Sequence, residues 1–199
     1  MRLSKAMLTC LTILLVFSAA CRRSGGSIGI LSPLDETAEA AAIVADANKD
    51  LTKIKVLYDQ NEGKREELKA AMEKNDVVEA KKIADEVLYL INDGTSFGKS
   101  AVEKIQSAQE MQINDDYREY LRLKEESLKR QLEAFENYRQ AARILRDSYD
   151  PKNAAMRDKV KEEFKTRSEN YRKIMEDARD YSNRANELAK DALKRQQGQ

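Results

Sequence analysis

The chain has 199 residues, 36 of them basic and 35 acidic, and only seven glycines and two prolines. So few turn residues exclude a β-sandwich or barrel, which needs one roughly every eight to twelve residues. The balanced charge excludes nucleic-acid binding driven by phosphate contacts, and the absence of histidine excludes most acid–base and metal chemistry.

The first twenty residues have the three parts of a secretory signal peptide. Arg2 and Lys5 form a basic start, residues 6–17 are an apolar run, and small residues follow at 18–20. The apolar stretch is shorter than the roughly 20 residues that cross a bilayer. We therefore expect residues 1–20 to be a cleaved signal peptide.

Ala19-Ala20-Cys21 resembles the lipobox of bacterial lipoproteins, with Ser18 standing where leucine is usual. The resemblance implies a diacylglycerol on the Cys21 thiol and a membrane anchor. It also favours the outer membrane, because Arg22 stands where an aspartate commonly directs Gram-negative lipoproteins to the inner membrane. It covers residues 1–22 only. The alternative is cleavage by ordinary signal peptidase, which the small residues at 18 and 20 would also suit.

Residues 21–31 follow as the expected lipidated cysteine and a flexible linker. This stretch contains Gly25, Gly26 and Gly29 together with two serines. Such a composition is typical of a tether that separates a folded domain from its anchor.

Residues 32–196 repeat apolar positions at steps of three and four, the pattern of packed helices. We expect helices over about 33–74, 76–112, 115–149 and 151–195, and Gly63 leaves open whether the first is continuous or broken near 60–64. The short connections predict an all-α, elongated, antiparallel up-down four-helix bundle with coiled-coil-like packing. The alternatives are a three-helix, spectrin-like rod with residues 33–60 loosely attached, and a homodimer that shares the apolar seam.

Gly94 and Gly98 interrupt the second expected helix within Gly-Thr-Ser-Phe-Gly. Glycine weakens a helix by about 1 kcal/mol relative to alanine. Both glycines fall on the apolar face, so we expect close helix packing or a kink there. A pocket where a ligand meets the backbone is the alternative.

Six tyrosines lie in the second half of the chain, where an amphipathic core edge explains them. If a partner surface exists, Tyr120 and Tyr138 with Arg122 and Arg139 are the expected exposed anchors, since tyrosine and arginine are common at interfaces. The acidic pairs, including Glu125-Glu126, have basic neighbours at helical spacing and are expected on a solvated face.

These observations predict a lipid-anchored, non-enzymatic protein of the cell envelope that acts by binding another protein. No cofactor, metal or nucleic-acid motif is present in the sequence. Two other functions stay open: a surface-exposed adhesin that binds a host factor, and a sensor-type bundle that binds a small ligand. No residue identifies the partner.

Overall fold

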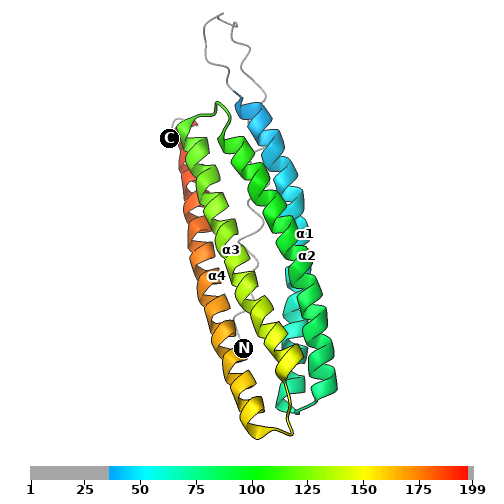
Figure 1. Cartoon of the computed structure of the whole chain (residues 1–199). Helices are drawn as coiled ribbons and strands as arrows, with labels where there is room; N and C mark the ends of the chain where they lie inside the picture. Colours follow the sequence, from blue (N-terminus) through cyan, green and yellow to red (C-terminus); the bar gives the residue numbers. More distant parts are fainter. Residues whose placement is uncertain (1–35, 197–199) are drawn as a thin grey trace, which may run out of the picture.

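The structure, a computed structural model, describes residues 36–196 and is all-helical over that range, with four helices and no strand. The helices are α1 (Thr37–Glu73), α2 (Val77–Gln109), α3 (Asp115–Ser148) and α4 (Ala154–Gln196). They lie side by side along one long axis, consistent with a four-helix bundle (Figure 1). Over the same range, none of the four is apolar enough along its length to cross a membrane. The expected signal peptide and linker lie outside the described residues.

Side chains at the helix starts satisfy the first free backbone amides. At the start of α2, Asp76 Oδ1 accepts a hydrogen bond from Glu79 N at 3.1 Å. At the start of α3, Asn114 Oδ1 accepts one from Tyr117 N at 2.8 Å. Helix α4 begins at Ala154 and not at the expected residue 151. Asn153 Oδ1 caps this start by accepting a hydrogen bond from Met156 N at 3.1 Å.

The glycines do not interrupt the helices. Helix α1 runs unbroken through Gly63, so of the two possibilities near 60–64 the continuous helix is the one observed. Helix α2 runs through Gly94 and Gly98, and both are buried. A Cβ on Gly98 would lie 2.6 Å from Cδ2 of Leu132 on α3, closer than carbon atoms pack. The glycine therefore leaves room for that leucine.

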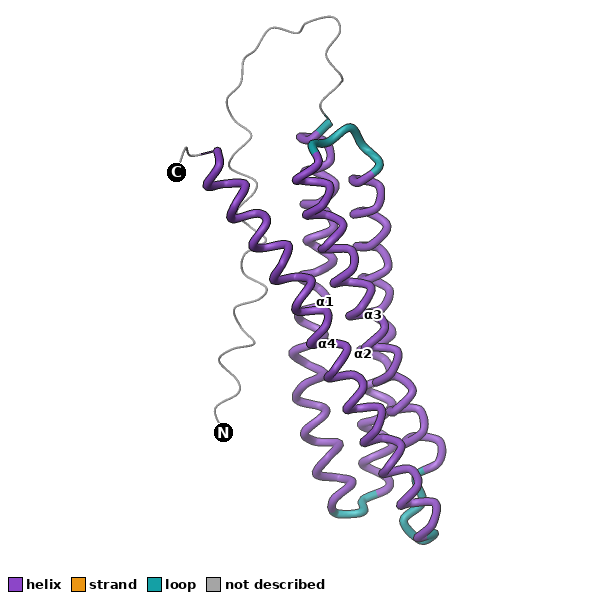
Figure 2. Tube along the Cα trace, turned by 90° about the vertical axis from the view of Figure 1, so that its left-hand side faces the viewer, coloured by secondary structure: helices purple, strands orange, loops and turns teal. Residues whose placement is uncertain are grey.

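Each end of the molecule is marked by contacts between segments far apart in the sequence. At the upper end in Figure 1, the start of α1 joins the α2–α3 connection, where Glu36 N donates to Gln112 O at 3.0 Å. At the lower end, the α1–α2 connection meets α3 and α4. There Asn75 Oδ1 lies 3.1 Å from the Tyr149 hydroxyl and 3.2 Å from Lys161 Nζ. Figure 2 shows the upper part of α4 inclined away from the other helices.

The buried side chains form two clusters, one toward each end. We call the cluster toward the α1–α2 connection the lower core. It is rich in large side chains, including Leu68, Leu145, Tyr138, Tyr149 and Tyr171. We call the other the upper core, and it contains Ala40, Ala47, Ala101, Ile105, Ala108, Tyr120, Leu121, Leu128 and Ala185 among others.

Candidate interaction site

Cys21, the residue expected to carry lipid, lies outside the described residues. Its modification therefore stays a prediction from the sequence.

The expectation that Tyr120 and Tyr138 are exposed partner anchors is wrong. Their exposed fractions are 8% and 1%. Tyr138 packs on Tyr171 and Phe164 of α4, with ring centroids 5.4 and 6.2 Å away, and Tyr120 stacks on Tyr117 at 6.1 Å. Because α3 packs against both α2 and α4, a wide arc of its surface is covered, and that arc includes both rings.

The two arginines expected beside these tyrosines do not form one surface with them. Arg122 Nε lies 2.7 Å from Glu119 Oε2, and Arg139 pairs with Glu136. Seventeen residues of helix separate the two arginines, a rise of about 25 Å. Each is instead part of a separate ion pair along α3.

Glu125 does not lie on a solvated face as expected but is buried between α2 and α3. Its carboxylate accepts hydrogen bonds from Gln106 Nε2 and Gln109 Nε2, both at 2.6 Å, and pairs with Lys129 Nζ at 2.7 Å. Burial opposes the ionisation of Glu125, but these three donors outweigh it and hold its pKa below the usual value. Every carboxylate oxygen thus has a partner, which is what makes the buried charge tolerable.

A second buried carboxylate joins α1 to α2. Asp50 is 5% exposed and accepts hydrogen bonds from Ser100 Oγ and Lys104 Nζ, each at 2.8 Å. Lys104 Nζ also lies 2.6 Å from Asp46. The hydrogen bond from Lys104 lowers the pKa of Asp50 despite its burial, and lowers that of exposed Asp46 to about 2. The other oxygen of Asp50 lies 3.4 Å from Lys53 Nζ on the same helix, so every carboxylate oxygen of Asp50 and Glu125 has a partner and both side chains serve as contacts between helices.

The lower core contains an arginine between two tyrosine rings. The guanidinium carbon of Arg65 on α1 lies 5.2 Å from the ring centroids of both Tyr138 on α3 and Tyr171 on α4. Burial raises the pKa of the Tyr138 hydroxyl to about 12 and raises that of Tyr171 as well. The polar group beside the Tyr138 hydroxyl is the Arg65 guanidinium, and the one beside the Tyr171 hydroxyl is the hydroxyl of Tyr58. The rings and the arginine connect α1 to α3 and α4 where the helices converge.

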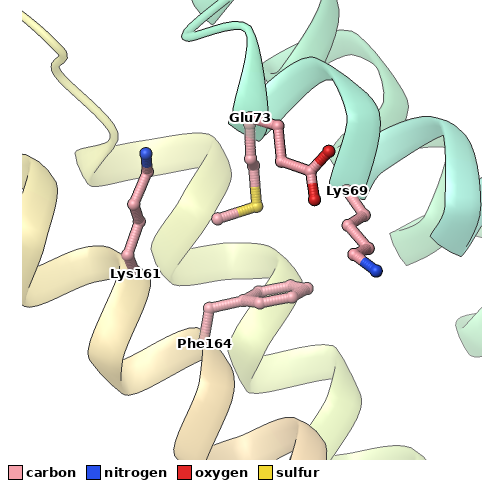
Figure 3. A pocket seen from close by; sticks show the side chains of 5 residues that line it. Lys69, Glu73, Lys161 and Phe164 are labelled. Atoms are coloured by element: carbon pink, nitrogen blue, oxygen red, sulfur yellow. The ribbon is translucent and has the colours of Figure 1, made fainter.

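A surface hollow of about 240 Å³ lies between the end of α1 and the start of α4. It is lined by Lys69, Met72, Glu73, Lys161 and Phe164, and we call it the α1–α4 hollow. Met72 is buried and Phe164 half-buried, so they form an apolar floor. Figure 3 shows Phe164 projecting from α4 toward Lys69 on α1, while Lys161 extends from α4 with its ammonium group on the side away from Lys69.

The charged groups around the α1–α4 hollow are available to a partner. Neither Lys69 nor Lys161 lies within ion-pair distance of a carboxylate in the range 36–196, and Lys161 Nζ donates a hydrogen bond to Asn75 Oδ1 at 3.2 Å. Charges of both signs surround the hollow, since the stretch 141–165 has seven basic and five acidic side chains and the stretch 62–76 has four basic and five acidic ones. The net positive charge belongs to the lining itself, which has Lys69 and Lys161 against Glu73.

The sequence could not point to this hollow, because its two walls are about ninety residues apart and neither carries a recognisable motif. No group of three or more metal-ligating side chains occurs in the described range 36–196. No family model, no curated protein and no solved structure matches the chain.

Proposed function

We propose that this protein is a lipid-anchored, non-enzymatic component of a bacterial cell envelope that acts by binding another protein. The observation that carries the proposal is the sequence around Cys21: a basic start, an apolar run and two alanines directly before the cysteine. Acyl chains on Cys21 would hold the protein on the membrane, since each buried CH₂ contributes about 0.8 kcal/mol. Arg22 favours the outer membrane.

The proposal includes an antiparallel up-down arrangement of the four helices. Two contacts between α1 and α2 support it. Lys64 of α1 pairs with Glu86 at 2.8 Å, whereas Asp50, earlier on α1, meets Lys104, later on α2. Between α2 and α3, Gln106 near the end of α2 meets Glu125 near the start of α3.

This arrangement gives the anchored molecule an orientation. Helix α1 begins at the upper end of Figure 1, so an anchor at Cys21 precedes that end in the chain. The 37 residues of α1 rise about 55 Å, which carries the lower end far from the membrane. The α1–α4 hollow lies at that lower end and would face outward, which supports a binding role.

The test is the intact mass of the protein extracted from membranes of cells that express the full chain. We expect the mass of a chain beginning at Cys21 plus its acyl groups. Cys21→Ser should abolish the added mass and membrane retention. The matched control, Cys10→Ser, lies in the segment that is removed and should leave the mature mass unchanged. A mature chain without lipid would contradict the anchor, and an uncleaved chain would contradict the signal peptide.

A further inference from the structure

The size of the α1–α4 hollow restricts what it can hold. At about 240 Å³ it falls below the roughly 300–1,000 Å³ of pockets that bury small ligands. It is also open to solvent along the seam between two helices. These properties fit one bulky side chain of a protein partner better than a whole metabolite.

The floor of the hollow fits an apolar side chain. Met72 contributes a flexible, polarizable thioether that adapts to different shapes, and Phe164 contributes a ring face. Phe164 is supported from behind by Tyr138, whose ring centroid lies 6.2 Å away. The floor is thus a fixed ring beside an adaptable methionine.

The rim specifies the charge of the partner. Lys69 and Lys161 both line the hollow, and neither lies within ion-pair distance of a carboxylate among the residues described. Glu73 is the one acid that lines the hollow, so the lining residues carry a net positive charge. An acidic segment would gain two ion pairs here without breaking any that already exist.

We propose that the α1–α4 hollow binds a segment of a partner protein in which one bulky apolar side chain is flanked by acidic residues. The apolar side chain covers Met72 and Phe164, and the flanking carboxylates pair with Lys69 and Lys161. The inference deepens the proposed function, on which it rests, by assigning the chemistry of the partner and the place where it binds.

The experiment uses the full chain in detergent and three labelled pentapeptides that carry benzoylphenylalanine or serine at the centre. The first peptide has benzoylphenylalanine between two pairs of aspartates. The second keeps the aspartates but has serine at the centre, and the third keeps benzoylphenylalanine but has lysines in place of the aspartates. Fluorescence anisotropy gives the affinities. Irradiation followed by mass spectrometry locates the covalent adduct, and we expect it at Met72 or elsewhere in residues 69–73 and 161–164, with the acidic photoreactive peptide only.

Charge reversal tests the rim. Lys69→Glu with Lys161→Glu should weaken binding of the acidic peptide by about tenfold or more, because two attractions become repulsions. The matched control is Lys99→Glu with Lys190→Glu, which reverses two exposed, unpaired lysines away from the hollow and should change affinity less than twofold.

Three results would overturn the inference: adducts outside the hollow, equal binding of the lysine peptide, or equal losses in the two double variants. An adduct yield that falls as the protein concentration rises would also overturn it, since the hollow would then be a contact between copies of the chain. Failure of peptide binding leaves the lipidated mass unaffected, so the two proposals fail separately.

Discussion

The lower core is dominated by large side chains and Arg65 beside it is only half-buried, whereas the upper core lies beside the three charged residues that are buried within the range 36–196, Asp50, Lys124 and Glu125. In the lower core, Phe135 and three tyrosines pack among leucines and isoleucines. In the upper core, alanines line α1 and α2, and Tyr120 is the one buried aromatic residue.

The difference shows two ways to set the register of neighbouring helices. Large side chains interlock in only one register, so the lower core needs few polar contacts. Small side chains fit in several registers. In the upper core, contacts such as Asp50 with Ser100 and Ser127 with the Ala178 carbonyl, at 2.8 and 2.7 Å, select one of them.

The largest expected effect comes from removing a fully buried leucine. Leu145→Ala in the lower core and Leu121→Ala in the upper core both leave a cavity, since neither residue is exposed. Each should reduce the free energy of unfolding by about 2–5 kcal/mol in urea denaturation followed by circular dichroism. A loss below 1 kcal/mol for one variant alone would mean that its core is not tightly packed.

A smaller effect is expected from Glu125→Gln, which places an amide donor where Gln106 and Gln109 already donate. Unsatisfied buried groups should lower the free energy of unfolding by about 1–3 kcal/mol at neutral pH. The neighbouring Glu126→Gln is the control and should change it by less than about 0.5 kcal/mol.

The same variant tests the acid sensitivity of the upper core. The pKa of Glu125 is lowered in the folded protein, so its ionised form stabilises the fold above the unfolded pKa of about 4.3. That contribution is lost as the pH falls through the lower, folded pKa. The stability difference between the wild type and Glu125→Gln should therefore shrink below about pH 4 in urea titrations at several pH values. A stability difference between the two proteins that stays constant down to pH 2 would contradict the stabilising role of the ionised Glu125.

The glycines distinguish an open helix face from a close helix approach. Gly63→Ala should stabilise the protein by about 1 kcal/mol, because a Cβ there meets no atom within 4 Å and alanine favours the helix. Gly98→Ala should raise the stability by less than that or not at all, because the Leu132 side chain must move to admit the methyl group. Thermal unfolding measures both, and equal gains would contradict the close packing at Gly98.

The smallest expected effect at neutral pH is that of Tyr138→Phe, because the hydroxyl that it removes loses its water on folding and gains a weak contact with the Arg65 guanidinium, and these two effects nearly cancel. The free energy of unfolding should change by less than about 0.5 kcal/mol. At high pH the variant should be the more stable protein. The pKa of Tyr138 is raised to about 12 in the folded protein and is about 10 in the unfolded chain. The stability that the neutral hydroxyl contributes is therefore fully present below pH 10 and is lost as the pH rises through 12. Urea unfolding at pH 7 and pH 11 tests both statements.

The helical class and the four helices of residues 36–196 could be predicted from the sequence. Spacings of three and four between apolar residues, and capping residues such as Asp76 and Asn114, act within a few residues of chain. The sequence did not determine which polar side chains are buried. Glu125 looked solvated because its basic neighbour at helical spacing explained it, and only the approach of α2 brought two glutamines to it.

The directions of the tyrosine rings and the place of the α1–α4 hollow depend on how the helices pack. A tyrosine ring suits a core edge and a surface equally, so the packing of α4 on α3 was needed to bury Tyr138. Met72 and Phe164 meet only because the end of α1 lies beside the start of α4. Contacts between distant segments depend on how whole helices pack, and local spacing carries no information about that.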